Sequence, residues 1–90
     1  MSFKIIIRNG KIVSGAGNPW FKGDVGIKDG KISRVGRLKA SDAEEVIDAE
    51  GLVVCPGFID AHSHSDMIIQ FNPEVESTLR QGITTLVTGN

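Results

Sequence analysis

A Pro-Gly pair at residues 56 and 57 divides the sequence into two stretches with different patterns, and this break limits the fold more than any other feature. Pro56 has no backbone N–H to donate to a sheet, and a glycine such as Gly57 can adopt dihedral angles that other residues avoid. Before the break, short apolar runs alternate with turn signals. After it, a strand pattern is followed by a helix pattern and a second strand pattern. We therefore expect residues 1–56 and 57–90 to form different structural units.

Two Asx-Gly dipeptides organise the first stretch. Asn9-Gly10 lies within "IIIRNGKIV" and Asp29-Gly30 within "DVGIKDGKIS". Such dipeptides favour two-residue type I′ turns, because both central residues of that turn need a positive φ. Hairpins centred on these turns predict two apolar cross-strand pairs: Ile7 with Ile12, and Ile27 with Ile32.

The remainder of the first stretch contains one loop and two short extended pieces. Residues 14–22 are rich in glycine, asparagine and proline, so we expect a loop that Trp20 and Phe21 close down onto the sheet. Extended pieces are expected around residues 46–47 and 52–55. Cys55 is the only cysteine, so it forms no internal disulfide, and we expect a small buried residue.

The second stretch predicts a parallel βαβ unit with a right-handed crossover. A strand is expected from Gly57 to His62. A helix would begin with Asn72 as its N-cap and Pro73 in its first turn, and it would end at Gly82. The β-branched run of residues 83–88 predicts a second, buried strand. Parallel strands are normally covered on both faces, and this chain is too short to cover them, so the sequence resembles part of something larger.

The only two histidines of the chain lie two residues apart in "DAHSHSD". Side chains at i and i+2 of a strand share a face, so we expect one face to carry Phe58, Asp60, His62, His64 and Asp66. Ile59 and Ala61 would face the other way, packed under a helix. Imidazole is the commonest metal-binding side chain, and ligands bind at the carboxyl ends of parallel strands. A divalent metal site is therefore predicted here. The alternative is a pair of solvated histidines, since an isolated His-x-His is a weak motif.

The composition excludes some classes of partner. The net charge is −1, with acidic and basic residues interspersed, and 40% of the residues are hydrophobic. No basic face for nucleic acid and no apolar run long enough to cross a bilayer is present in the sequence. With a single cysteine, the chain fits a reducing, cytoplasmic compartment.

The segment "VVCPGFIDAHSHSD" resembles the first-strand signature of the amidohydrolase superfamily, whose members are metal-dependent hydrolases built on a (β/α)8, or TIM-like, barrel. Members of this branch also carry a small β-sandwich, and residues 1–55 are similar to its strands. "HSHSD" and "LRQGITTLVTGN" are similar to the N-acyl-D-amino-acid deacylases, or D-aminoacylases.

This resemblance implies a mixed α/β fold that is incomplete in 90 residues. Residues 1–56 would form the N-terminal part of the composite β-sandwich, and residues 57–90 would form strand 1, helix 1 and strand 2 of the barrel. His62 and His64 would bind zinc, as one or two divalent ions. Asp66, Asp60 and Asn90 would line or support the site.

The resemblance also implies that some catalytic parts lie outside this chain. The family's metal-ligating cysteine follows the Gly-Asn that ends here at Asn90, and its catalytic aspartate comes from a distant strand. No catalytic residue is therefore expected within these residues. We expect an N-terminal fragment that is inactive alone, from a protein that hydrolyses N-acyl-D-amino acids.

Two other functions stay open from the sequence. A cyclic amidase of the dihydroorotase or hydantoinase kind would have a metal-bridging lysine further along the chain. A non-catalytic β-rich module would leave its melting temperature unchanged when zinc is added. The exposed edges of the parallel strands also leave self-association of the isolated chain open.

Overall fold

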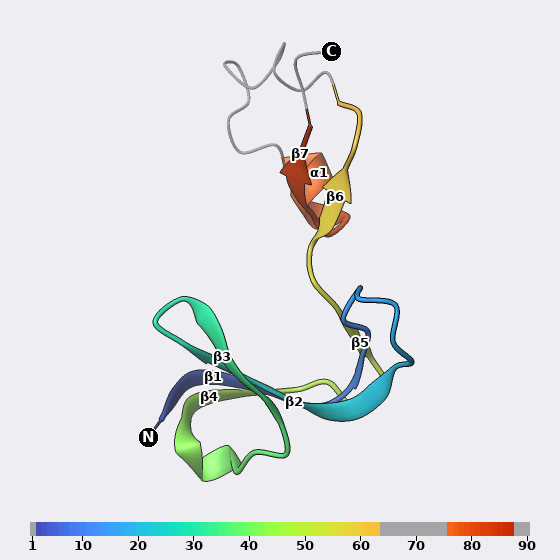
Figure 1. Ribbon diagram of the computed structural model, residues 1–90. Coiled ribbons are helices and arrows are strands. Elements are labelled where there is room, and N and C mark those ends of the chain that lie inside the picture. Colours follow the sequence, from blue (N-terminus) through green and yellow to red (C-terminus); the bar gives the residue numbers. More distant parts are fainter. Residues whose placement is uncertain (1, 64–75, 88–90) are drawn as a thin grey trace. The chain divides into compact units, whose positions relative to one another are not determined.

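The computed structural model describes residues 2–63 and 76–87, and it divides into two compact units, Met1–Pro56 and Gly57–Asn90 (Figure 1). The first unit contains five strands and one 3-10 turn: β1 (Phe3–Ile12), β2 (Phe21–Lys28), β3 (Lys31–Gly36), η1 (Ala40–Asp42), β4 (Ala43–Asp48) and β5 (Val53–Val54). The second unit contains β6 (Phe58–Asp60), α1 (Glu76–Arg80) and β7 (Ile83–Leu86).

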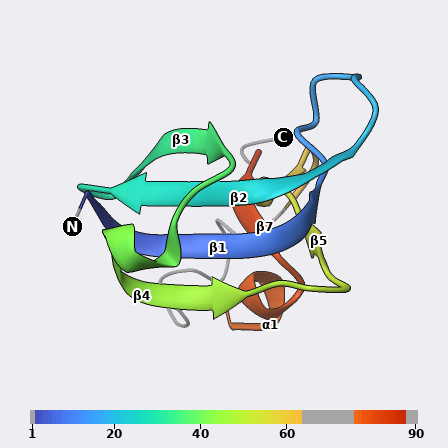
Figure 2. The same cartoon turned by 90° about the horizontal axis from the view of Figure 1, so that it is seen from below.

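A single five-stranded sheet forms the first unit, in the order β3-β2-β1-β4, with β5 pairing the far end of β1 (Figure 2). β2 runs antiparallel to both β1 and β3. β4 and β5 run parallel to β1, and they bond to its first and last residues, respectively. The long strand β1 therefore holds the sheet together, because every other strand except β3 bonds directly to it.

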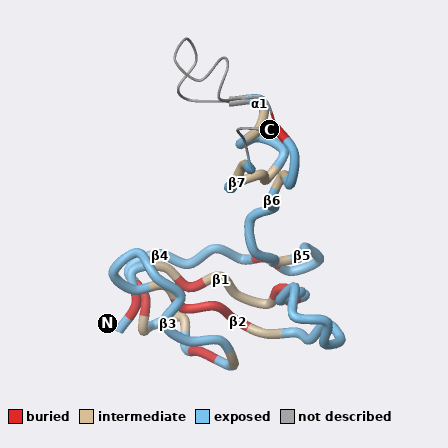
Figure 3. Tube along the Cα trace, turned by 45° about the horizontal axis from the view of Figure 1, so that its top comes forward, coloured by how far each residue is buried: buried red, intermediate tan, exposed pale blue. Residues whose placement is uncertain are grey.

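Buried residues of the first unit lie on both faces of this sheet, since Ile6 pairs with Gly26 and the buried Val25 pairs with Ile7, the next residue of β1. Phe3, Ile6, Leu38 and Ala43 form a buried cluster, and Ile6 is completely inaccessible. Buried residues follow β1 and β2, whereas β3 is exposed over most of its length (Figure 3). Leu38 and Ala43, on either side of η1, complete the cluster around Ile6 without a second sheet among the described residues.

The predicted hairpin turn at Asn9-Gly10 is wrong, because β1 continues through both residues. Asn9 has a φ of 62° and lies in a β-bulge. Ile7 pairs with Val25 and Gly10 pairs with Gly23, so β1 has one more residue than β2 between these pairs. A Cβ on Gly10 would overlap the side chain of Val54. The dipeptide thus supplies a positive φ and space for β5, and not a chain reversal.

Ile7 and Ile12 consequently lie on the same strand and do not pair across two strands. Residues five apart in a regular strand point to opposite faces, but the extra residue of the bulge restores the same face. Both side chains line one apolar groove, together with Phe21 and Val54.

The second turn prediction is confirmed. Asp29 and Gly30 have φ values of 54° and 75°, as a type I′ turn requires, and Ile27 pairs with Ile32. The predicted loop and the two short extended pieces are present as well, the latter as parts of β4 and β5, with Gly51 between them.

Two expectations about packing in the first unit are wrong. Trp20 is 57% exposed and does not close the loop onto a core; the ammonium of Lys11 lies 4.4 Å from the centre of its ring. Cys55 is exposed and not buried. It borders the apolar groove of the first unit.

The second unit has the predicted parallel arrangement, because β6 and β7 pair in parallel and α1 lies between them in the chain. Gly82 has a φ of 83°, and its N–H donates to the carbonyl of Leu79, so it ends the helix as predicted. The predicted start of the helix at Asn72 and Pro73, and the last strand residue Thr88, lie outside the described residues.

The strands of the second unit are less buried than predicted. Ile59 is 68% exposed and Ala61 is exposed, so the described residues place no helix over this face. Thr84 and Thr85 of β7 are exposed too. The described part of the unit offers one five-residue helix, which is too little to cover two faces. Within residues 2–63 and 76–87, no helix is long and apolar enough to cross a membrane.

Candidate metal centre

Hydrogen bonds join the two parallel strands beyond the last residue of β6. The N–H of Phe58 donates to the carbonyl of Gly82 at 2.8 Å, at the amino ends of the strands. At the carboxyl ends, the N–H of Val87 donates to the carbonyl of Asp60, and the N–H of Ser63 donates to the carbonyl of Val87, each at 2.9 Å. Val87, the residue after β7, therefore bonds to the chain on both sides of His62.

Asp60 fixes the backbone of His62 directly. Its Oδ1 accepts a hydrogen bond from the His62 N–H at 3.2 Å, which forms an Asx-type turn at the end of β6. His62 is exposed and lies in a bend, so the strand is shorter than the predicted Gly57–His62. The predicted alternation of side chains therefore ends at Asp60, because the turn changes the backbone direction.

Ser63, which lies between the two histidines, was not predicted to matter. It is 8% exposed, and it is one of only two polar or charged residues buried within the described ranges. Its bond to Val87 joins residues that are distant in the chain, so no pattern around residue 63 indicates it.

His64, Asp66 and Asn90 lie outside the described residues. Among residues 2–63 and 76–87, no three or more His, Cys, Asp and Glu side chains lie close enough together to hold a metal ion. The described part of the candidate centre thus consists of Asp60, His62 and the anchored backbone. A metal site that uses both histidines stays a prediction.

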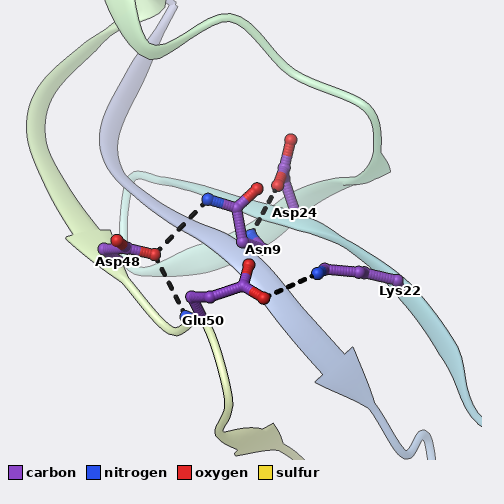
Figure 4. Close-up of polar contacts among 5 residues, drawn as sticks. All are labelled: Asn9, Lys22, Asp24, Asp48 and Glu50. Carbon is purple, nitrogen blue, oxygen red and sulfur yellow. Dashed lines mark hydrogen bonds and ion pairs between the residues drawn. The ribbon is translucent and has the colours of Figure 1, made fainter.

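A second polar cluster lies in the first unit around the β1 bulge (Figure 4). Its side chains form hydrogen bonds and an ion pair with other groups of the same unit. Asp24 is buried; its Oδ1 accepts from the Asn9 N–H, and its Oδ2 accepts from the Leu38 N–H, both at 2.9 Å. Asp48 Oδ1 accepts from the Glu50 N–H at 3.0 Å and from Asn9 Nδ2 at 3.3 Å.

The same contacts change the acidity of Asp48. The Glu50 N–H and then the Asn9 amide hold the pKa of Asp48 below its usual value of 3.8, and the charges of Arg8 and Lys22 add to this effect. Lys22 Nζ also lies 2.9 Å from Glu50 Oε1. These groups tie β1, β2 and the segment after β4 together, which is a structural role.

A family model described as the amidohydrolase family matches residues 45–90, which include the candidate metal centre. The N-acyl-D-glutamate deacylase of Alcaligenes xylosoxydans xylosoxydans is 41% identical over 86 residues, which is 96% of this chain and 18% of that protein.

Solved structures give the same likeness. A crystal structure of N-acyl-D-glutamate deacylase from Bordetella bronchiseptica, with zinc and a phosphonate inhibitor, is 40% identical, with a TM-score of 0.91 over 100% of this chain and 19% of that chain. A D-aminoacylase structure, from work on its binuclear metal centre, is 41% identical, with a TM-score of 0.92 over 98% of this chain and 19% of that one.

The chain therefore spans about a fifth of the length of the relatives it matches. The strand-rich first unit corresponds to the N-terminal part of these deacylase structures. On the strength of the family model, which covers more than half of its residues, the chain belongs to the amidohydrolase family.

Proposed function

We propose that the protein carrying these residues hydrolyses the amide bond of N-acyl-D-amino acids with the help of a divalent metal ion. The observation that carries this proposal is the 40–41% identity, over nearly the whole chain, to an N-acyl-D-glutamate deacylase and a D-aminoacylase. Those two proteins are described with zinc and with a binuclear metal centre, respectively, so zinc is the cation we propose.

In this proposal His62 and His64 hold the metal. The chain supplies two imidazoles, whereas a catalytic zinc usually has three protein ligands and one open position. The donor set therefore fits part of a zinc site, and the other ligands would come from elsewhere in a longer protein. A bound cation would lower the pKa of a coordinated water to about 7 and polarise the amide carbonyl.

Asp60 acts in this proposal as a positioning residue. Because its Oδ1 accepts the His62 N–H, it fixes the backbone that presents the first imidazole. The bond from Ser63 to Val87 fixes the residue between the two histidines. Together these contacts hold the segment at the carboxyl ends of β6 and β7, which is where parallel α/β proteins bind their ligands. Asp66 and Asn90 are proposed to contact the substrate near the same site.

The two units are proposed to be parts of larger domains. Met1–Pro56 would be the N-terminal part of a composite β-sandwich, and Gly57–Asn90 would begin a TIM-like barrel. We also propose a cytoplasmic location, since the single cysteine fits a reducing compartment.

The direct test is an assay of the complete gene product that carries these residues. With zinc added, we expect it to release free D-amino acids from N-acyl-D-glutamate or a related linear amide. The change His62→Ala should lower kcat/KM by a factor of about 100 or more, because it removes a metal ligand.

Three controls separate the alternatives. Preferential hydrolysis of a 5-substituted hydantoin would identify a cyclic amidase and contradict the deacylase proposal. No hydrolysis of either substrate class, by folded protein loaded with zinc, would contradict amide hydrolysis altogether. The isolated 90-residue chain with zinc should show no turnover.

A further inference from the structure

We propose that the isolated chain associates with further copies of itself by pairing β3 of one copy with β4 of the next. These strands are the two edges of the first unit's sheet, and within the described residues nothing pairs with their outer sides. An unpaired edge presents a row of backbone N–H and C=O groups, which is a template for another strand. This inference does not depend on amide hydrolysis.

The directions of the two edge strands permit an open series of copies. β3 is antiparallel to β2, β2 is antiparallel to β1, and β1 is parallel to β4. β3 and β4 therefore run in the same direction. A second copy in the same orientation can place its β4 beside β3 as a parallel pair. Such a head-to-tail contact does not close on itself, so it produces oligomers of increasing size.

The faces of the sheet determine the register of this pairing, because directly paired residues share a face. On one side, Ile32 pairs with Ile27, and Ile27 pairs with Ile5 of β1. On the other side, Ile47 pairs with Ile7 of β1. Ile5 and Ile7 are two residues apart in β1, so they point to the same face. Ile32 and Ile47 thus belong to one face, and they are 67% and 47% exposed. Placing them opposite each other covers both side chains.

This register also brings opposite charges together. Counting the extra residue Ser33 at the bulge in β3, Arg34 falls opposite Asp48, and both belong to the other face of the sheet. β3 contains Lys31 and Arg34 and no acidic residue, whereas β4 contains three acidic residues and no basic one. Cross-strand pairs of opposite charge stabilise a sheet, and like charges oppose it.

Sedimentation velocity at low salt tests this inference. The wild-type chain should form oligomers larger than dimers as its concentration rises to about 1 mM, and added salt should weaken them. Ile47→Lys should abolish the oligomers, because it puts a charge opposite Ile32. The matched variant Leu79→Lys, which changes an exposed leucine of α1, should leave them intact.

A charge exchange tests the register. Arg34→Glu should weaken the association by roughly fivefold or more, and the double variant R34E/D48R should restore it, since each contact regains one pair of opposite charges. The control variant R34E/E45R has the same net charge as R34E/D48R, but its arginine lies on the opposite face of β4. This control should not restore the association. A chain that stays monomeric at low salt would overturn the proposal. So would oligomers that survive Ile47→Lys, or oligomers restored equally by the Glu45 control.

Discussion

At the scale of single residues, Asp24 is only 5% exposed, and backbone N–H groups bond to both oxygens of its side chain. These bonds hold the β1 bulge at Asn9 and the backbone at Leu38. Asp24→Ala leaves two N–H groups without their acceptor, and we expect it to lower the free energy of unfolding by about 2–4 kcal/mol. Asp24→Asn keeps one acceptor and should cost about half as much. Urea unfolding followed by circular dichroism measures both losses, and equal stability of the two variants would contradict this role.

Asp48 predicts a dependence of stability on pH. The Glu50 N–H and the Asn9 amide hold its pKa in the folded chain below 3.8, so its charged form is favoured by folding. A carboxyl with a depressed folded pKa contributes stability above its unfolded pKa, and this contribution is lost as the pH falls from about 3.8 through the lower folded value. Asp48→Asn should flatten the fall in melting temperature between pH 4 and pH 2. An unchanged slope would contradict this assignment.

At the scale of elements, Gly57 permits the parallel pair β6–β7 to form. A Cβ on this residue would overlap the side chain of Thr84 on the neighbouring strand. Gly57→Ala should therefore speed hydrogen exchange at the amides of Phe58 and Val87, which bond across the pair, while the amides of β1 and β2 remain protected. Adding Thr84→Gly removes the overlapping atoms and should slow exchange again. Unchanged exchange in Gly57→Ala would contradict this close approach.

The two Asx-Gly dipeptides illustrate how much of the fold the sequence can predict. Asp29-Gly30 lies directly between the two strands that pair, β2 and β3, so local chemistry is sufficient to predict the hairpin. Asn9-Gly10 has the same chemistry but forms a bulge. Its partners, Asp24 and Val54, are distant in the chain, and no local pattern contains them. The exposure of Cys55 was missed for a similar reason, since burial depends on tertiary contacts and not on the local sequence.

The same limit applies to the candidate site. The spacing of the two histidines and the acidic residues beside them predicts His62 and Asp60 as site residues, and their role in metal binding stays a prediction. The Asx-type turn lies within residues 60–62, but the bond from Ser63 to Val87 could not be predicted, because it joins residues that are distant in the chain. Tertiary bonding thus defines how the first histidine is presented.

At the scale of the whole molecule, the account rests on one claim: His62 and His64 bind the same divalent cation. These are the only histidines of the chain, so their imidazole signals in an NMR spectrum report on nothing else. On titration with zinc, we predict that both sets of ring signals change together and stop changing at one zinc per chain. Replacing either histidine with alanine should abolish the change at the other at the same zinc concentration. Ring signals that do not move, or that move independently without saturating, would contradict the claim.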